Sequence, residues 1–121
     1  MVTIFEAVGG DKTFVDLVER FYSGVETDPI LRPMYPATLE PSKRHLTLFL
    51  IQYFGGPRTY LDERGHPRLR ARHLPFPIDQ AARDHWITHM SAAVEQMNLP
   101  VAAKDEFLNY FTGAADFLMN S

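Results

Sequence analysis

One stretch in the middle of the chain restricts the fold more than any other: Arg64-Gly65-His66-Pro67-Arg68-Leu69-Arg70-Ala71-Arg72-His73-Leu74-Pro75-Phe76. Between Pro67 and Pro75 there is room for one short helix, over residues 67–73, because proline is accepted in the first turn of a helix but cannot continue one. Five of the nine arginines lie between positions 58 and 72, whereas the rest of the chain is acidic. The stretch therefore combines a short helix, a cluster of guanidinium cations and a histidine, His73, that precedes an apolar segment.

Before this stretch, the apolar residues recur at helical spacing. A short helix is expected over residues 3–8, and Asp11 is expected to cap a second helix that ends at Asp28-Pro29. Residues 31–36 contain two prolines and predict a tight turn. A third helix should begin near positions 41–42 and end at Gly55. The inward positions of these two long helices are Phe14, Leu17, Val18, Phe21 and Val25, then Leu46, Phe49, Leu50 and Tyr53.

After the third helix, residues 57–67 are predicted to be irregular. A fourth long helix follows Asp79, which is a suitable N-cap, and Pro100 opens the last helix. No segment alternates with the period of two residues that is typical of a strand. The sequence therefore predicts an all-α protein with four long and two short helices, in a single domain over residues 1–121.

Composition excludes several classes of protein. A chain of 121 residues with 45% hydrophobic residues can bury one core. The absence of cysteine excludes disulfides and thiolate chemistry. A net charge of −3 argues against general nucleic-acid binding. With no apolar run of about 20 residues and no signal-peptide pattern, we expect a cytoplasmic protein without membrane contact.

His73 has the surroundings that a haem ligand needs. A haem requires one axial imidazole, apolar walls and cations for its two propionates, and all three occur within about ten residues of His73. The arginine cluster suits an anion because each guanidinium can bind a carboxylate with two hydrogen bonds. The same residues also fit a solvated basic turn, and their spacing alone does not decide between these interpretations.

A zinc site is the second chemistry that the histidines suggest. His85 and His89 lie four residues apart on a predicted helix, which is one part of a zinc-binding pattern. A third ligand is not evident, and the HExxH motif is absent. The pattern therefore favours zinc less than haem.

Several polar aromatic residues lie on otherwise apolar faces. Tyr22 follows Phe21 near the end of the second helix and shares a face with Val18, Tyr35 lies in the turn between Pro33 and Pro36, and Trp86 leads the inward face of the fourth long helix. A buried tyrosine or tryptophan needs a partner for its O–H or N–H group, so each can be explained by core packing alone. If the three converged on one pocket, they could donate hydrogen bonds to a negatively polarised ligand.

The chain resembles the truncated haemoglobins of the second, or O-type, group, from Phe5 to about Asn120. The motifs that carry the resemblance are Phe5-Glu6-Ala7-Val8-Gly9-Gly10, Arg20-Phe21-Tyr22, Leu31-Arg32-Pro33-Met34-Tyr35-Pro36, Gln52-Tyr53-Phe54-Gly55-Gly56-Pro57-Arg58-Thr59-Tyr60, Gly65 to His73 and Arg83-Asp84-His85-Trp86. The resemblance implies a truncated globin fold, which is a two-over-two helical sandwich around haem b.

The resemblance also implies roles for individual residues. It makes His73 the proximal ligand and metal-binding residue of a five-coordinate iron, and it puts Tyr22, Tyr35 and Trp86 in the distal pocket. Members often have alanine at the position of Ser42 and tryptophan at the position of Phe54, so Ser42 could add a weak hydrogen bond or a water site. The further haem-contact candidates are Leu46 and Leu50 as pocket wall, Phe76, and Arg72, His45 and Tyr60 for the propionates.

Two functions of different class follow from this resemblance. The first is binding of oxygen, as a carrier, store or sensor, with nitric oxide, carbon monoxide or peroxide as other small ligands. The second is a haem redox enzyme with nitric oxide dioxygenase or peroxidase-like activity, which would need a separate, unidentified reductase. A homo-oligomer is compatible with both. Strong hydrogen bonds from the distal pocket would slow oxygen release, so simple oxygen delivery is a poor fit.

Overall fold

The computed structural model describes residues 2–121, and within them the chain folds into seven α-helices and one 3₁₀ turn, without a strand. The helices are α1 (Ile4–Ala7), α2 (Asp11–Glu26), α3 (Glu40–Tyr53), α4 (Thr59–Arg64), α5 (Leu69–His73), α6 (Gln80–Gln96) and α7 (Val101–Leu118), with the 3₁₀ turn η1 at Arg32–Met34. The expected all-α class and the four long helices are confirmed.

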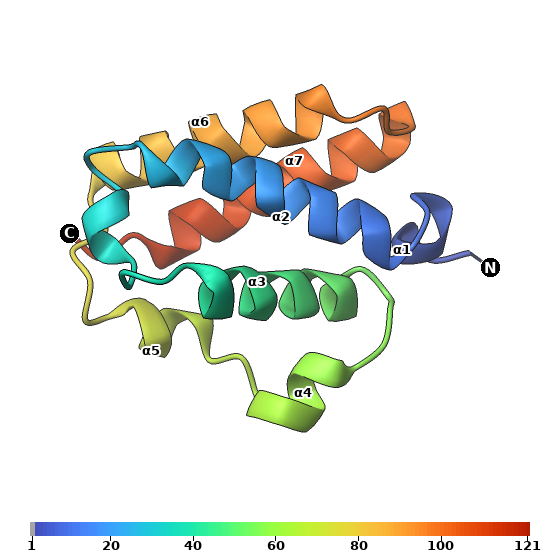
Figure 1. The fold of residues 1–121 in the computed structure, drawn as a ribbon, viewed down its shortest axis with the longest axis horizontal. Helices are drawn as coiled ribbons and strands as arrows, with labels where there is room; N and C mark the ends of the chain where they lie inside the picture. The colour runs from blue at the N-terminus through green and yellow to red at the C-terminus, as the bar shows by residue number, and fades with distance from the viewer. Residues whose placement is uncertain (1) are drawn as a thin grey trace.

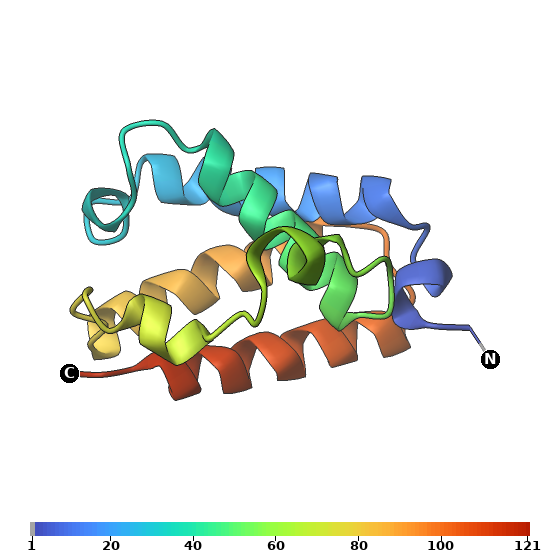
Figure 2. The ribbon, with the colours of Figure 1, turned by 90° about the horizontal axis from the view of Figure 1, so that it is seen from below.

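The four long helices form two stacked pairs. Helices α2 and α3 run antiparallel on one side, and α6 and α7 run antiparallel on the other, as seen from below in Figure 2. Helix α2 also packs across α6, which joins the two layers. The short helices α4 and α5 lie on the far side of α3 in Figure 1. The arrangement is the two-over-two sandwich that the resemblance implies.

Local sequence signals explain most helix boundaries. In α1, the Thr3 hydroxyl accepts a hydrogen bond from the Glu6 amide at 3.2 Å, and the Glu6 carboxylate accepts one from the Thr3 amide, which is a capping box. In α6, the Asp79 carboxylate accepts from the Ala82 amide at 2.9 Å, as predicted. Asp11 is not the cap of α2: it is the first helical residue, and Gly10 occupies the N-cap with a φ of +80° and no side-chain bond.

Two further expectations are wrong. Residues 57–67 are not irregular throughout, because α4 forms over Thr59–Arg64 and the Tyr60 side chain in this helix is buried. Tyr53 does not belong to the inward face of α3: it is 54% exposed, and its ring lies against Tyr110 of α7 with a centroid distance of 4.0 Å. Helix α3 itself begins at Glu40, one residue before Pro41.

The core consists largely of phenylalanine rings. Phe14 and Phe21 of α2 and Phe107 and Phe111 of α7 are almost completely buried. Each such side chain contributes about 1.5–3 kcal/mol through burial. Phe54, at the end of α3, packs edge-on against Phe107 with a centroid distance of 4.7 Å. The cluster reaches the cavity, where Phe111 forms part of the wall.

Gly55 fixes the path of the chain out of α3. Its φ is +99°, and a Cβ atom there would lie 2.6 Å from the Cβ of Thr3, so neither the conformation nor the space admits a side chain. The close approach lets the Phe5 amide donate to the Phe54 carbonyl at 2.9 Å. Helix α1 is thereby attached to the end of α3.

Candidate functional site

A cavity of about 530 Å³ lies between the two helical layers and α5. That volume is within the range of small-molecule and cofactor sites. Its walls come from α2, the η1 turn, α3, α4, α5, α6 and α7. All eleven site residues predicted from the sequence line it, namely Tyr22, Tyr35, Ser42, His45, Leu46, Leu50, Tyr60, Arg72, His73, Phe76 and Trp86.

His73 is the last residue of α5, and its ring is oriented by a single hydrogen bond. The Nδ1 atom lies 2.5 Å from the carbonyl oxygen of Leu69, one turn earlier in the helix. A carbonyl only accepts hydrogen bonds, so Nδ1 carries the proton, and in the neutral ring Nε2 keeps a free lone pair. Nε2 has no hydrogen-bond partner among residues 2–121. A ring held in this way is prepared to coordinate a metal through Nε2.

Three hydrogen-bond donors meet at another part of the cavity. Tyr22 comes from α2, Tyr35 follows the η1 turn, and Trp86 comes from α6. The rings of Tyr22 and Tyr35 meet edge to face with a centroid distance of 5.5 Å. Trp86 packs against Phe21 at 5.4 Å and Phe111 at 5.8 Å. The convergence that the sequence left open is therefore present.

Burial raises the pKa of both tyrosines above the ordinary value. Desolvation raises the pKa of Tyr22 far above its ordinary value, and the neighbouring Tyr35 raises it further. Desolvation also raises the pKa of Tyr35 to about 12, although hydrogen bonding with Tyr22 and Trp86 opposes the change. Both hydroxyls hence keep a proton to donate at neutral pH.

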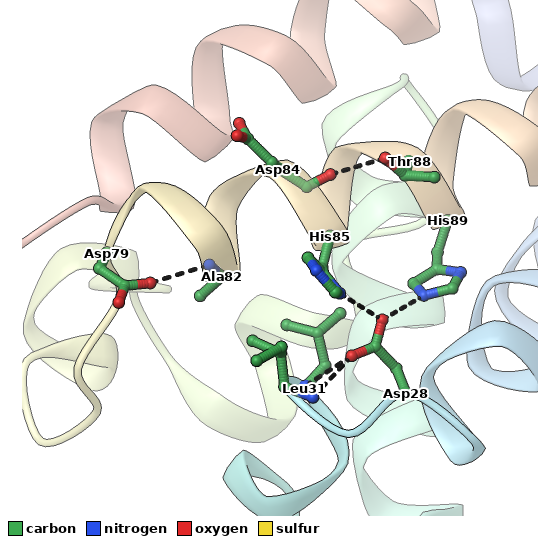
Figure 3. Close-up of polar contacts among 9 residues, drawn as sticks. Asp28, Leu31, Asp79, Ala82, Asp84, His85, Thr88 and His89 are labelled. Atoms are coloured by element: carbon green, nitrogen blue, oxygen red, sulfur yellow. Dashed lines mark hydrogen bonds and ion pairs between the residues drawn. The ribbon is translucent and has the colours of Figure 1, made fainter.

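A buried carboxylate connects the parts of the protein that carry these donors. Asp28, just beyond α2, accepts hydrogen bonds on Oδ1 from the backbone amides of Ile30 and Leu31, at 2.8 and 3.0 Å. On Oδ2 it accepts from His85 at 2.8 Å and His89 at 2.6 Å, both on α6 (Figure 3). Although desolvation opposes ionisation, these bonds hold the pKa of Asp28 well below its usual range. The cluster ties the segment leading to Tyr35 to the helix that carries Trp86.

The same cluster accounts for the histidine pair that suggested zinc. One nitrogen of His85 and one of His89 are bonded to the same carboxylate oxygen of Asp28. Within residues 2–121, no group of three histidine, aspartate, glutamate or cysteine side chains is placed to hold a metal ion. The role that the structure gives this pair is to link two elements.

Arg64, which the sequence interpretation did not select, lies at the cavity with an unusual environment. One of its terminal nitrogens lies 2.8 Å from Nε2 of His45. Its Nε is the one buried side-chain nitrogen or oxygen among residues 2–121 that has no hydrogen-bond partner. Desolvation, followed by the charges of the nearby arginines, lowers the pKa of His45, so this ring is neutral and accepts from Arg64. An unsatisfied buried guanidinium N–H is costly unless a ligand binds it.

The arginines of the central stretch lack carboxylate partners. Arg83 lines the cavity but is paired with Asp116 at 2.8 Å and Asp84 at 3.1 Å. Arg72 also lines it, and its Nε donates to the Pro67 carbonyl at 2.7 Å. No carboxylate of residues 2–121 forms an ion pair with Arg58, Arg64, Arg68, Arg70 or Arg72.

These observations fit a haem. Apolar walls from Leu46, Leu50 and Phe49 suit a flat porphyrin, and Phe76 and the buried Tyr60 also line the cavity. Two unpaired guanidinium groups at the same cavity suit its two propionates. A sequence signal for Arg64 did exist, since it belongs to the arginine cluster and follows Tyr60 by one helical turn.

The known proteins to which the chain is similar are globins. Residues 3–120 match the family described as bacterial-like globin. The group 2 truncated hemoglobin YjbI of Bacillus subtilis (strain 168) is 43% identical over 95 residues, which cover 78% of this chain and 71% of that protein. The solved hemoglobin of the thermophilic phototrophic bacterium Chloroflexus aurantiacus is 53% identical, with a TM-score of 0.98 and 100% of both chains covered. The truncated oxygen-avid haemoglobin from Bacillus subtilis is 36% identical, with a TM-score of 0.93, and the match covers 98% of this chain and 100% of that one.

In the part of the chain that the structure describes, none of the helices combines the length and the apolar character that crossing a bilayer requires.

Proposed function

The chain belongs to the bacterial-like globin family, among the group II truncated haemoglobins, and we propose that it binds oxygen through a five-coordinate haem b whose single protein ligand is His73. Membership of this family brings with it a haem cofactor and the binding of small diatomic ligands. The observation that carries the proposal is the hydrogen bond from His73 Nδ1 to Leu69, because it leaves Nε2 free at a cavity of suitable size.

The residues around the cavity divide the task of holding the haem. Arg64 and Arg72 bind the propionates, and His45 and Tyr60 orient Arg64, whose guanidinium lies 5.8 Å from the Tyr60 ring centre. The apolar walls, including Leu46, Leu50 and Phe76, exclude water from the two faces of the porphyrin.

When bound, the haem supplies an iron with one open coordination position for a diatomic ligand. Tyr22, Tyr35 and Trp86 donate hydrogen bonds to a ligand that carries partial negative charge. Each charge-assisted hydrogen bond contributes roughly 1.5–3 kcal/mol. Ser42 lies at the same cavity and offers a weaker donor or a water site.

Donors of this strength favour retention of oxygen over rapid delivery. A difference of about 1.4 kcal/mol corresponds to a tenfold change in affinity, so two or three donors slow release by orders of magnitude. The related structure from Bacillus subtilis is described as oxygen-avid, which supports the same behaviour here.

A redox enzyme on the same haem is the second candidate. The observation that favours it is the set of oxidisable rings in contact at the cavity, with Tyr22 and Tyr35 meeting edge to face and Trp86 nearby. Such an enzyme would oxidise nitric oxide with oxygen, or use peroxide, and would require an external reductase. Carriage and storage require ligand release without net oxidation, so product analysis separates the two functions.

The proposal is tested on purified protein loaded with haem. We expect a Soret band at one haem per chain, oxygen binding in the ferrous state, and slow release in stopped-flow measurements. His73→Gly should lose stable haem binding and regain the five-coordinate spectrum when imidazole is added. Stoichiometric haem with an unchanged spectrum in that variant would refute the assignment of His73. Multiple turnover of nitric oxide or peroxide would favour the redox enzyme over the carrier.

A further inference from the structure

Asn120, the residue before the C-terminus, is bonded to the segment that follows His73. Its side-chain Nδ2 donates to the carbonyl of His73 at 3.2 Å and to the carbonyl of Phe76 at 2.9 Å. Its Oδ1 accepts from the Ile78 amide at 2.9 Å, and its own amide donates to the Ile78 carbonyl at 3.0 Å. Figures 1 and 2 both show the C-terminus beside the loop between α5 and α6.

Helix α5 cannot hold His73 in place by itself. It has only five residues, and helices shorter than about 12 residues are marginal without tertiary contacts. It starts after Arg68, whose φ of +47° is an uncommon backbone conformation for a residue with a side chain. The position of α5 must therefore be set by contacts with the rest of the protein.

The loop after His73 has few backbone donors, although the Leu74 amide donates to the Arg70 carbonyl and the Phe76 amide donates to the His73 carbonyl at 3.0 Å. Pro75 and Pro77 have no N–H groups, so few regular hydrogen bonds can form between His73 and Ile78. The two side-chain amide hydrogens of Asn120 donate to the carbonyls of His73 and Phe76, which stand at the two ends of residues 73–76. One of these carbonyls belongs to His73 itself, and the other to Phe76, which lines the cavity.

We infer that Asn120 is a positioning residue for the proximal histidine: it holds the backbone of His73, and through it the orientation of the imidazole toward the haem. The inference rests on the proposed function, because it takes His73 as the iron ligand. Asn120 itself is absent from the walls of the cavity, so it acts through the backbone of His73.

The side-chain chemistry of Asn120 permits a selective test. Asn120→Asp keeps an oxygen for the Ile78 amide but loses the donors to His73 and Phe76. Asn120→Ala loses all of these side-chain bonds and keeps only the backbone bond to Ile78. Asn98→Ala is the matched control, because Asn98 is exposed and makes no side-chain hydrogen bond among residues 2–121.

The experiment uses the haem-loaded protein and two measurements: the iron–histidine stretching frequency by resonance Raman spectroscopy in the ferrous, ligand-free state, and the rate of haem transfer to excess apomyoglobin. Asn120→Asp and Asn120→Ala should both shift or broaden the iron–histidine band. Haem loss should become about three- to tenfold faster, the effect of losing one or two hydrogen bonds. Asn98→Ala should match the unmodified protein in both measurements.

The outcomes separate this inference from the proposed function. An unmodified protein without an iron–histidine band would refute His73 as the ligand, and the role of Asn120 with it. An intact band that neither variant moves would overturn the role of Asn120 alone, even if haem loss became faster, because faster loss alone reflects only a loosened C-terminus. If Asn120→Ala does not fold, Asn120→Asp decides, since it retains the bond from Ile78.

Discussion

Trp86 combines core packing with an N–H donor at the cavity. Its indole lies between Phe21 and Phe111, so an aromatic ring at this position supports the core as well as the cavity. Tyr22 is 4% exposed and contacts both Phe21 and Tyr35. A substitution that keeps a ring but removes the N–H group of Trp86 therefore separates hydrogen bonding from packing.

Trp86→Phe should accelerate oxygen release by at least about tenfold, because it removes a donor whose bond contributes roughly 1.4 kcal/mol or more. Haem content should stay at one per chain, since phenylalanine retains the contacts with Phe21 and Phe111. Stopped-flow displacement of oxygen measures the rate. A release rate equal to that of the unmodified protein would remove Trp86 from the set of donors.

Arg64 and Arg72 should differ in how strongly they retain haem. The Nε of Arg64 is buried without a partner, whereas that of Arg72 already donates to the Pro67 carbonyl. Arg64→Ala should speed haem loss by about tenfold, as expected for a charge-assisted bond, and Arg72→Ala by less. Haem transfer to apomyoglobin gives both rates, with the exposed Arg58→Ala as control. A larger effect at Arg72, or equal rates in all variants, would contradict this assignment.

At this scale, the sequence selected side chains that line the cavity more readily than side chains held by partners far away in the chain. His73, Tyr22 and Trp86 were recognisable because their residue types and motif positions carry information. Asp28 was recognised only as the end of a helix, since its histidine partners lie 57 and 61 residues away. No local sequence pattern indicates a contact between residues so far apart in the chain.

At the scale of the elements, helices α2 and α6 approach each other closely at Gly24. A Cβ atom added to Gly24 would overlap the ring of His89, and that ring cannot move freely because it is bonded to Asp28. In contrast, Gly113 in α7 has no other atom within 4 Å of an added Cβ. Gly24 therefore allows α6 to approach α2 closely enough for the Asp28 cluster to form.

Gly24→Ala should destabilise the protein by about 1–3 kcal/mol through overpacking, a loss larger than the gain in helix propensity. The matched variant Gly113→Ala should stabilise it by up to about 1 kcal/mol, because only the propensity changes. Urea unfolding followed by circular dichroism measures both. If the two variants changed stability in the same direction, the close approach would not be the reason for glycine at position 24.

The long helices were predictable because their apolar faces repeat over several turns, as in α2 with Phe14, Leu17, Val18 and Phe21. Helix α4 was not, because six residues between Pro57 and Gly65 are too few to show a period. Its Tyr60 ring is buried only because α4 packs against α3, and a local sequence pattern does not show that contact. For Tyr53 the helical spacing predicted burial that the structure does not show, because this residue continues the apolar face of α3 beyond the core.

Over the whole molecule, aromatic burial has a cost that depends on pH. Desolvation raises the pKa of Tyr35 and of Tyr110 to about 12 and that of Tyr22 higher still, from an ordinary value of 10.0. Tyr110 is raised further by its neighbour Tyr53. All three side chains line the cavity, so we expect alkali to destabilise the fold at the candidate site.

The stability of the protein should fall steeply as the pH rises from about 10 to about 12. In the unfolded chain these tyrosines lose their protons near pH 10, whereas in the folded protein they keep them to about pH 12 or beyond. The unfolded state then binds fewer protons than the folded state, and each such tyrosine lowers the free energy of unfolding by about 1.4 kcal/mol per pH unit. Below pH 10 the contribution is complete and constant. Urea unfolding at pH 9, 10, 11 and 12 measures how the free energy of unfolding changes with pH. Tyr35→Phe should reduce this slope by the contribution of one tyrosine, about 1.4 kcal/mol per pH unit. A slope that Tyr35→Phe leaves unchanged would mean that the Tyr35 hydroxyl ionises at the same pH in the folded and unfolded states, which would contradict the raised pKa that burial gives it.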